Sequence, residues 1–508
     1  MEPVASHAET PDVSFDGGDL DCGNGLLLLI RRHIDPLPRG GLLEILSREI
    51  SVDEDLPAWC RLTSNELISW TKDGKQRSFL VCKGRFDERG RTPEVPATKP
   101  LAPALSPAAA QSCPVEKISA PAIPALAVMG LGSWPRPRWM VEATHAYIEG
   151  RLDEAAFQET ADDAVRLAVA AQEKAGADVI SDGEQRRDSY ASFVATRLDN
   201  CQLVPLIDLL PLVDHPEEFE AELRALDVPA DEVRHPGVFG PIGRSRPIAR
   251  HELDFMRAQT QKPIKIALPG PYLLARTMWM ECLSEQVYQS REVIAADLVQ
   301  VLRAELADLL DGGAALVQFD EPVLSEVVFS AKNAGGKNKR SFMCGALSES
   351  LGPAHELAFA RELMNAVVDG FDGSRIAVHV CRGNWTPDES VALSGSYEPL
   401  IETLRDMKVG AYLLEMCTPR AGEMDILKRL PETARLGIGV VNQKNVQTES
   451  VEDVAAKIQQ AIDLFGRDRL LFHPDCGFAT FCDNPICSHP NAEQKLAVIT
   501  RAAERFRG

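Results

Sequence analysis

The sequence lacks any apolar run long enough to cross a bilayer. Residues 26–30 form the longest such run near the N-terminus, and a spanning helix needs roughly 20 residues. Residues 1–21 are acidic and contain no basic stretch followed by an apolar core, so we expect no export signal. We therefore expect a cytoplasmic protein with no membrane partner.

An excess of basic residues is also missing. The chain has 54 Lys and Arg against 75 Asp and Glu, which gives a formal charge of -21. Such a charge disfavours nucleic acids and anionic membrane surfaces as partners. The 12 cysteines do not have the close spacing of small disulfide-bonded domains, which indicates reduced thiols in the cytosol.

What is present is the composition of an ordinary globular protein, with 45% hydrophobic and 25% charged residues over 508 positions. This length is sufficient for two or three domains. In residues 13–86, short apolar strands alternate with helices, which is typical of a small two-layer α/β domain. We expect strands at 13–15, 42–46, 67–71 and 78–82, and helices at 24–33 and 56–62.

Cys22 directly precedes the first of these helices. A thiol at a helix N-terminus meets the positive end of the helix dipole and free N–H groups, which favour the thiolate. Cys22 is therefore a candidate reactive thiol. The alternative is a small residue in the capping region with no chemistry.

This domain resembles the TusA-like sulfur-carrier family. The likeness spans residues 21–83 and rests on Leu-Pro-Arg-Gly at 37–40, Leu-Glu-Ile at 43–45, residues 55–63, and Glu66-Leu67. The resemblance implies that Cys22 carries a persulfide and that a sulfurtransferase is a partner. The family's Cys-Pro-x-Pro prolines are absent here, and Asn65 stands where the family usually has histidine.

Residues 87–124 are rich in Pro and Ala and show no apolar periodicity. Such a composition favours extended, partly polyproline-II conformations over a packed core. We interpret this segment as a linker between the small domain and the rest of the chain.

Residues 125–508 alternate short apolar strands with amphipathic helices. Eight strands, each followed by a helical or irregular crossover, predict a (β/α)8 TIM barrel with insertions. The expected strands lie at 127–131, 178–181, 264–268, 315–319, 375–380, 411–415, 437–441 and 470–472. An open doubly wound sheet is the alternative, but no Gly-x-Gly-x-x-Gly follows the first strand,.

Polar residues follow nearly every predicted strand, where a barrel places its active site. Side chains two positions apart on a strand share a face, so His379 and Cys381 point the same way. Two later strands end in Glu415 and in Cys476. One imidazole, two thiolates and one carboxylate suit zinc with an exchangeable position, so we predict a zinc site at His379, Cys381, Glu415 and Cys476.

Two alternatives exist for this metal site. The same residues can be buried barrel side chains without a metal. Cys476, Cys482, Cys487 and His489 can instead form a local zinc knuckle, although their spacing lacks the usual Cys-x2-Cys pattern,. Asp320 and Glu321 are candidates for binding an amine or for acid–base catalysis; the alternative is a carboxylate pair that stabilises a helix N-terminus.

Residues 125–507 resemble the catalytic C-terminal barrel of the cobalamin-independent methionine synthase family. The matching motifs are Leu-Gly-Ser-Trp-Pro at 131–135, Asp-Gly-Glu at 182–184, Gly-Pro at 270–271, Phe-Asp-Glu-Pro at 319–322, His-Val-Cys at 379–381, Glu415, and Pro-Asp-Cys-Gly at 474–477. The resemblance implies methyl transfer from a methylfolate to homocysteine, with zinc held by the four residues above. It also implies that Ser133, Glu184 and Asp320 contact the acceptor, the carboxylates pairing with its ammonium group.

Three features depart from that family: the residue at 444, the residue at 277, and the N-terminal domain. Lys444 stands where a histidine usually helps to protonate the departing folate, and a lysine there needs a tuned pKa,. The aromatic residue that stacks on the pterin aligns with Thr277, and Trp279 is two positions away. Arg244 matches a folate-contacting arginine, and the additional N-terminal barrel of the long enzymes is replaced by the Cys22 domain.

The sequence thus leaves three functions to weigh. The first is a zinc-dependent methyltransferase acting on a thiol such as homocysteine, with methylfolate as the leading donor and a corrinoid-bound methyl group as the alternative. The second is a zinc-dependent thiol alkyltransferase, or an enzyme that incorporates sulfur carried on Cys22. The third is a carrier protein in which zinc is only structural.

Overall fold

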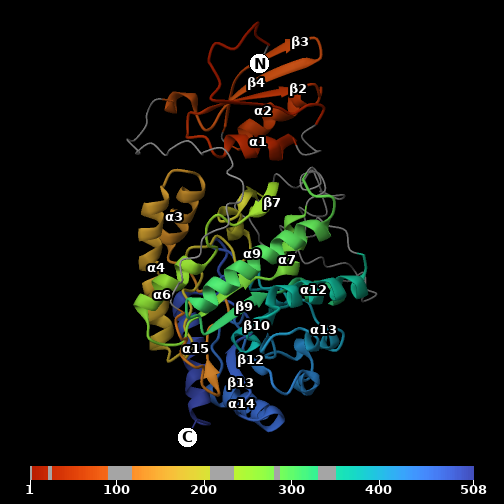
Figure 1. The fold of residues 1–508 in the computed structure, drawn as a ribbon. Coiled ribbons are helices and arrows are strands. Elements are labelled where there is room, and N and C mark those ends of the chain that lie inside the picture. The colour runs from red at the N-terminus through yellow and green to blue at the C-terminus, as the bar shows by residue number, and fades with distance from the viewer. Residues whose placement is uncertain are drawn as a thin grey trace. The chain divides into compact units, whose positions relative to one another are not determined.

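The structure is a computed structural model that describes residues 3–20, 26–63, 65–89, 117–205, 234–279, 287–329 and 351–507 (Figure 1). The chain divides into two compact units, residues 1–117 and 118–508. Cys22 and residues 90–116 of the predicted linker lie outside the described residues.

The N-terminal unit contains one mixed sheet with strand order β1-β2-β4-β3, in which β1 and β2 are parallel and the other pairs antiparallel. Its elements follow the order expected from the sequence. They are β1 (Val13–Asp16), α1 (Leu27–Ile34), β2 (Leu42–Ser47), α2 (Val52–Leu62), β3 (Glu66–Asp73), β4 (Gln76–Cys82) and the 3-10 helix η2 (Phe86–Glu88).

Both helices of this unit share one apolar cluster with the sheet. Ile30 of α1 and Leu56 of α2 lie in it with Ile45 and Phe79 of the sheet, all nearly inaccessible to solvent. Alternate residues of the same strands, such as Leu80, belong to a separate small cluster, as expected when successive strand side chains point to opposite faces. The helices and the sheet therefore share one core, while the two-layer fold and the kinship with sulfur carriers stay predictions.

The end of the predicted linker packs against the C-terminal unit. The N–H of Ile118 donates to the carbonyl of Asp311 at 2.9 Å, and the Arg435 guanidinium donates to the carbonyl of Ile123 at 3.1 Å. Ile123 also packs against an apolar cluster formed by strand residues. Residues 118–124 thus have fixed contacts in the structure, which their composition alone did not predict.

The C-terminal unit is built around a seven-stranded, entirely parallel sheet with order β5-β13-β12-β11-β10-β9-β8. These strands are β5 (Ala127–Val128), β8 (Lys265–Pro269), β9 (Leu316–Asp320), β10 (Ile376–Val380), β11 (Ala411–Leu414), β12 (Arg435–Val441) and β13 (Leu470–Pro474). Where the sequence predicts a strand at 178–181, single parallel bridges join Met129 to Val179 and Ile180 to Ile264. The sheet is therefore curled as in a TIM barrel, because this segment bridges residues next to both of its edges.

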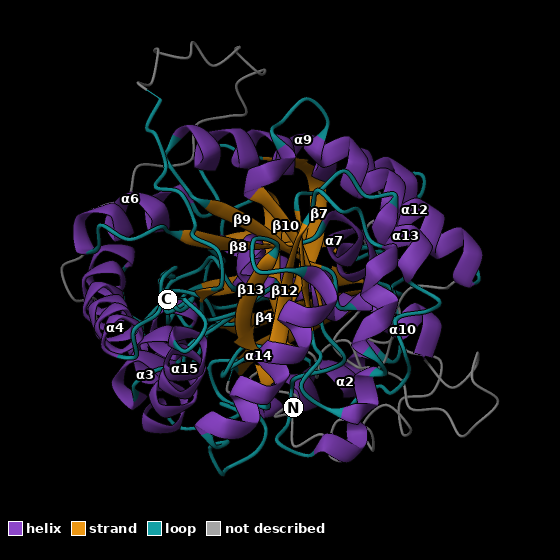
Figure 2. Ribbon diagram, turned by 90° about the horizontal axis from the view of Figure 1, so that it is seen from below, coloured by secondary structure: helices purple, strands orange, loops and turns teal. Residues whose placement is uncertain are grey.

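Helices surround these strands, and Figure 2 shows β8, β9, β10, β12 and β13 at the centre with α4, α6, α9, α12 and α13 around them. The α-helices of this unit are α3 (Arg138–Ile148), α4 (Glu154–Lys174), α6 (Arg250–Gln259), α7 (Pro271–Met278), α9 (Arg291–Asp311), α10 (Val323–Phe329), α12 (Pro353–Val368), α13 (Ile401–Arg405), α14 (Val451–Phe465) and α15 (His489–Glu504). Short 3-10 helices are η3 (Ser192–Thr196), η7 (Gly373–Arg375), η8 (Glu389–Val391), η9 (Pro419–Ala421) and η10 (Met424–Arg429). No helix in the described ranges has the length and hydropathy to span a bilayer.

Local sequence explains where several helices begin. The side chain of Asp153 accepts the Ala156 N–H at the start of α4, and Ser450 does the same for Asp453 at the start of α14. Such N-caps satisfy backbone donors that the first helical turn leaves free. Buried residues of α14 then recur every three or four positions, and they are Val454, Ala455, Ile458, Ala461 and Phe465, which identifies the face toward the strands.

One element was not expected from the sequence. Strands β6 (Asp199–Pro205) and β7 (Arg234–Gly243) form an antiparallel two-stranded ribbon outside the parallel sheet. Val204 and Val238 are fully buried in it. The ribbon lies in the crossover between the segment at 178–181 and β8, a place where barrels commonly carry insertions.

The register of the parallel strands sets the positions of the polar residues at their carboxyl ends. His379 in β10 pairs with Asp320 in β9 on one side and with Leu413 in β11 on the other. Because parallel strands end on the same side of the sheet, residues distant in sequence meet there.

Candidate functional site

A cavity lies at the carboxyl ends of the strands and collects most of the residues selected from the sequence. Its lining includes Ser133, Glu184, Asp320, His379, Cys381 and Cys476. These residues lie at or just after the carboxyl ends of five different strand segments of the C-terminal unit. The structure therefore brings three of the four predicted zinc ligands and the predicted acceptor contacts into one chamber, whereas Glu415 is not part of its lining.

His379, Cys381 and Cys476 form a cluster of metal-capable side chains. Their ligand atoms all lie within 4.8 Å of one another, and Nε2 of His379 is 3.7 Å from Sγ of Cys476. The other ring nitrogen of His379, Nδ1, lies 2.9 Å from the carbonyl oxygen of Leu413. A carbonyl only accepts hydrogen bonds, so Nδ1 carries the proton and the Nε2 lone pair is available to a metal.

Burial keeps the side chains of His379 and Cys476 in this cluster uncharged. The neutral imidazole is ready to bind a metal, whereas the thiol would lose its proton on binding. Burial lowers the pKa of His379 to about 3, so the imidazole is neutral near pH 7,. A hydrogen bond with Cys381 and burial raise the pKa of the Cys476 thiol well above its usual value. A neutral imidazole beside two thiols is a donor set that fits zinc, which binds thiols as thiolates.

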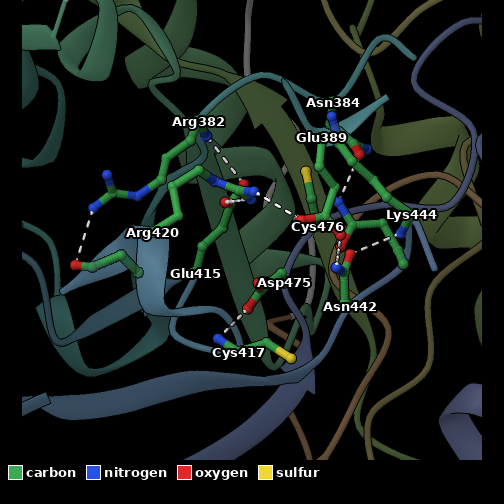
Figure 3. A network of polar contacts seen from close by, with 12 residues as sticks. Arg382, Asn384, Glu389, Glu415, Cys417, Arg420, Asn442, Lys444, Asp475 and Cys476 are labelled. Atoms are coloured by element: carbon green, nitrogen blue, oxygen red, sulfur yellow. Dashed lines mark hydrogen bonds and ion pairs between the residues drawn. The ribbon is translucent and has the colours of Figure 1, made fainter. Parts of the chain in front are cut away.

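Glu415 lies beside this cluster and is held by arginines (Figure 3). Its Oε1 accepts the Arg382 backbone N–H at 3.0 Å, and its Oε2 is 3.6 Å from the Arg420 guanidinium. Burial raises the pKa of Glu415, whereas Arg420 and Arg382 oppose that rise. Glu415 is not one of the three residues whose ligand atoms lie within 4.8 Å of one another, so its role as a fourth ligand stays a prediction.

Glu184 contributes a buried carboxylate from a strained turn. Its φ is +55°, a left-handed conformation that few residues other than glycine adopt,. The turn is held because the Glu184 N–H donates to Asp182 at 2.9 Å and the Glu184 carbonyl accepts from Arg136 at 2.7 Å. Its Oε2 is buried without a hydrogen-bond partner in the described chain. An oxygen of this kind is suited to a ligand that donates hydrogen bonds.

Asp320 is oriented by a chain of buried polar groups. Lys265 donates to Oε1 of Gln318 at 2.7 Å, and Nε2 of Gln318 donates to Oδ1 of Asp320 at 2.6 Å. Lys265 also donates to the carbonyl of Leu131. Because the Gln318 amide occupies Oδ1, the second carboxylate oxygen of Asp320, Oδ2, is available to a ligand that donates hydrogen bonds,.

Burial disfavours the charged forms of the ionisable side chains at this end of the cavity. Burial and the neighbouring Glu184 raise the pKa of Asp320 to about 7, and burial raises the pKa of Glu184. Burial lowers the pKa of Lys265 to about 8. A ligand with an ammonium group would favour the ionised carboxylates and offset their mutual repulsion.

Two residues predicted to bind substrate have other partners. The Glu321 carboxylate accepts the backbone N–H groups of Tyr272 and Leu273, at 2.8 and 3.0 Å, at the start of α7. The Arg244 guanidinium donates to Glu305 at 2.8 Å and to Asp308. Neither residue belongs to the cavity lining. For Glu321 the geometry is that of the alternative interpretation, a carboxylate at a helix N-terminus.

Lys444 lies near the cluster but does not line the cavity. It is 5% exposed, and its Nζ has no hydrogen-bond partner among the described residues. Burial lowers the pKa of Lys444, while Glu415 opposes this effect and Cys476 and Cys381 do so more weakly. The backbone N–H of Lys444 donates to Asn442 at 2.9 Å, which fixes the loop after β12.

The cavity also contains residues that the sequence analysis did not select. Gln318, Asn384, Trp385 and Tyr190 line it, whereas Thr277 and Trp279 do not. Asn384 donates to the Gly477 carbonyl at 2.7 Å, which joins the loops after β10 and β13. The available signal was a polar residue within an apolar strand, as with Gln318 and Lys265, because such residues are rarely buried without a partner.

The alternative knuckle of Cys476, Cys482, Cys487 and His489 is not among the metal-capable clusters of the described chain. Cys476 belongs with His379 and Cys381, and Nδ1 of His489 accepts a hydrogen bond from Trp134 at 3.0 Å. Cys482 lies in a different cluster with His145 and Asp483.

Comparison with known proteins identifies a family for the C-terminal unit. The family described as "Cobalamin-independent synthase, Catalytic domain" matches residues 126–204 and 219–504. A methionine synthase of Sulfurisphaera tokodaii is 26% identical over 357 residues, covering 70% of this chain and 86% of the relative. A methionine synthase of Thermococcus kodakarensis is 27% identical over 386 residues, covering 76% and 94%.

Two solved structures share the fold. The B12-independent methionine synthase from Shewanella sp. W3-18-1, in complex with selenomethionine, superposes with a TM-score of 0.57 at 23% identity and covers 75% of this chain and 98% of that one. The putative vitamin-B12 independent methionine synthase from Listeria monocytogenes gives a TM-score of 0.54 at 18% identity and covers 76% and 99%. Both match a length similar to that of the C-terminal unit.

Proposed function

Because the chain belongs to the cobalamin-independent synthase catalytic-domain family, we propose that it is a zinc-dependent methyltransferase that converts homocysteine to methionine. The observation that carries this proposal is the convergence of His379, Cys381 and Cys476 in the cavity that also contains Glu184 and Asp320. One group of residues suits a thiol-binding metal, and the other suits an amino group.

Zinc would be held by His379, Cys381 and Cys476, with Glu415 as the fourth ligand. When bound, the ion lowers the pKa of the acceptor thiol, so that the sulfur remains nucleophilic at neutral pH. The Leu413 carbonyl keeps the proton on Nδ1 of His379 and leaves Nε2 free,. Arg420 and the Arg382 N–H orient Glu415 from the other side.

The remaining residues position the acceptor. The unpaired Oε2 of Glu184 and the carboxylate of Asp320 would bind its ammonium group,. The Ser133 hydroxyl donates to the carbonyl of Ala479, so its oxygen is free to accept a further hydrogen bond from the same ammonium group. Fixing both ends of the acceptor reduces the entropy lost when its sulfur meets the methyl donor.

In the transfer itself, an electron pair on the acceptor sulfur attacks the methyl carbon in line. The bond from that carbon to N5 of the methylfolate breaks, its electron pair stays on nitrogen, and a proton is added there. Lys444 would supply this proton, because burial lowers its pKa toward the working pH,.

Methylfolate is the donor we propose, and a corrinoid-bound methyl group is the alternative. The alternative is favoured by Thr277 and Trp279, which do not line the cavity, and by Arg244, which pairs with Glu305. A sulfur-incorporating reaction fed by Cys22 and a sulfurtransferase remains a prediction from the sequence alone.

The test is an activity screen on zinc-loaded protein. Homocysteine is combined with methylfolate or with methylcobalamin, and methionine is measured by mass spectrometry. Methionine from methylfolate supports the proposal, product from methylcobalamin alone would replace the donor, and no product from either would contradict methyl transfer. Comparing Cys22→Ser with the unchanged protein, with a persulfide sulfur donor added, tests the carrier: equal turnover would rule it out.

A further inference from the structure

A second group of metal-capable side chains lies outside the cavity. His145 is near the end of α3, whereas Cys482 and Asp483 are in the loop between β13 and α15. Their ligand atoms all lie within 4.8 Å of one another. Nε2 of His145 is 2.5 Å from Oδ1 of Asp483, and Sγ of Cys482 is 2.9 Å from Oδ2 of the same carboxylate. None of these residues belongs to the proposed catalytic metal site.

Burial and charge distinguish this group from a surface cluster. Cys482 is 3% exposed, and the side chains of Asp483 and His145 are 9% and 25% exposed. Burial raises the pKa of the Cys482 thiol. Burial would also raise the pKa of Asp483, but hydrogen bonds from His145 and Cys482 outweigh it, and the net shift is downward. The carboxylate is therefore ionised at neutral pH and faces both other ligands.

We propose that His145, Cys482 and Asp483 bind a second zinc ion, with water as the fourth ligand. Imidazole nitrogen, thiolate sulfur and carboxylate oxygen are the three ligand types that zinc takes in proteins. Binding forms the Zn–S, Zn–N and Zn–O bonds and releases the thiol proton of Cys482 to solvent, since only the thiolate is a ligand. The proton that Nε2 of His145 donates to Asp483 also leaves that nitrogen, so that the ring carries its single proton on Nδ1,. His145 would ligate through Nε2 as the neutral imidazole.

The position of this site indicates a structural role, which is to hold the loop between β13 and α15, and not a role in methyl transfer. The same loop carries Thr480, which lines the cavity, and follows Cys476 of the catalytic cluster. The loop is attached on one side because the Cys482 N–H donates to the carbonyl of Asp188 at 2.8 Å. The His145–Asp483 ion pair already links the loop to α3. A zinc ion would strengthen that link by adding Cys482 to it, and so stabilise the cavity wall without contacting the substrate.

Metal counting in single variants of the whole protein tests this inference. The protein is loaded with zinc, excess metal is removed by gel filtration, and zinc per chain is measured by mass spectrometry. We expect two ions in the unchanged protein, one in Cys482→Ser and one in Cys381→Ser. The matched control is Cys487→Ser, which removes a half-buried thiol of the same loop that belongs to neither cluster, and which should retain two.

The zinc counts of the variants distinguish a missing second site from a missing catalytic site. One ion in the unchanged protein, kept by Cys482→Ser and lost by Cys381→Ser, would overturn the second site and leave the first. Two ions with Cys381→Ser losing none would contradict the first. If Cys482→Ser does not fold, His145→Gln replaces it and is judged by the same count.

Cobalt gives an independent readout. Replacing zinc by Co²⁺ should produce a sulfur-to-metal charge-transfer band in Cys381→Ser/Cys476→Ser, where Cys482 is the remaining cluster thiol. Loss of that band when His145→Gln is added supports the proposed ligand set. Absence of the band in the double variant would mean that Cys482, Asp483 and His145 form only a hydrogen-bonded group.

Discussion

Nε2 of His379 lies 3.7 Å from Sγ of Cys476, although 97 positions separate the two residues in the chain. The carbonyl of Leu413 accepts a hydrogen bond from the other ring nitrogen, so the nitrogen facing the sulfur carries the lone pair. An imidazole lone pair beside a thiol, in a buried position, is the local arrangement from which a zinc site is made.

Removing Cys476 should abolish both zinc retention and turnover. Changes to groups that only orient metal ligands typically cost about 10–100-fold in affinity or activity, so loss of a direct ligand by Cys476→Ser should cost more than about 100-fold. Zinc content and methionine formation are measured on the same preparation. Cys487→Ser is the matched control, and equal activity of the two variants would contradict the assigned ligand.

Glu184→Gln and Asp320→Asn should raise KM for homocysteine far more than they change kcat at saturation. Removing one partner of a buried charge pair costs about 2–5 kcal/mol, which corresponds to about 30-fold or more in affinity. Steady-state kinetics with varied homocysteine measure this effect.

Glu321→Gln is the matched control for these carboxylates, because Glu321 accepts backbone N–H groups of α7 instead of lining the cavity. It should lower Tm, since a helix N-terminal carboxylate contributes about 0.5–2 kcal/mol, and leave KM unchanged. If Glu321→Gln raises KM as much as Glu184→Gln does, Glu321 binds the substrate and the assignment to the helix N-terminus is wrong.

The stability of the acceptor-free protein should depend on Asp320 and pH. Its pKa is raised to about 7, so between about pH 4 and pH 7 the unfolded chain loses a proton that the folded chain retains. Stability from this group therefore falls as pH rises through that window. Asp320→Asn should raise Tm by at least about 2 °C at pH 8 and by nothing at pH 4, as measured by scanning calorimetry. A Tm gain of equal size at both pH values would contradict the assignment.

Lys444→Met should lower kcat with methylfolate by about 100-fold, the lower range for a general acid, while KM for homocysteine stays the same. Lys444→His should retain most of the activity, because the family usually has histidine at this position. Rates are measured as a function of pH. If Lys444→Met keeps the pH profile and kcat of the unchanged protein, Lys444 does not donate the proton.

Gln318→Leu should raise KM for homocysteine by about 10-fold, since losing a buried hydrogen bond to a charged group costs about 1.5–3 kcal/mol. The amide of Gln318 links Lys265 to Asp320, so the variant leaves Asp320 ionisable but unoriented. An unchanged KM, with folding verified by circular dichroism, would show that Asp320 needs no such support.

The residues found from the sequence are those whose position follows from strand order alone. His379, Cys381 and Cys476 each follow an apolar run, and parallel strands end on one side, so their meeting could be predicted before any contact was known. Strand order also selected Asp320, whereas Glu184 was selected through the family resemblance, and both line the cavity.

The rest depended on contacts between distant residues that no local pattern encodes. Glu321 follows Asp320 directly in the chain, but its side chain points to the other side and accepts a backbone N–H at the start of α7,. Arg244 follows β7, whose antiparallel ribbon was not predicted, and its partner Glu305 lies in α9. The second cluster needed the loop after β13 to reach α3, a proximity that the spacing of His145 and Cys482 does not reveal.

The pairing of His379 with Asp320 across β10 and β9 has a consequence for which amino acids are accepted. Neighbouring strands lie about 4.8 Å apart, so the sulfur-binding and amine-binding ends are separated by a fixed span of backbone. Under the proposed function this span selects the acceptor by its length: homocysteine would engage both ends at once, whereas cysteine, one methylene group shorter, would reach only one.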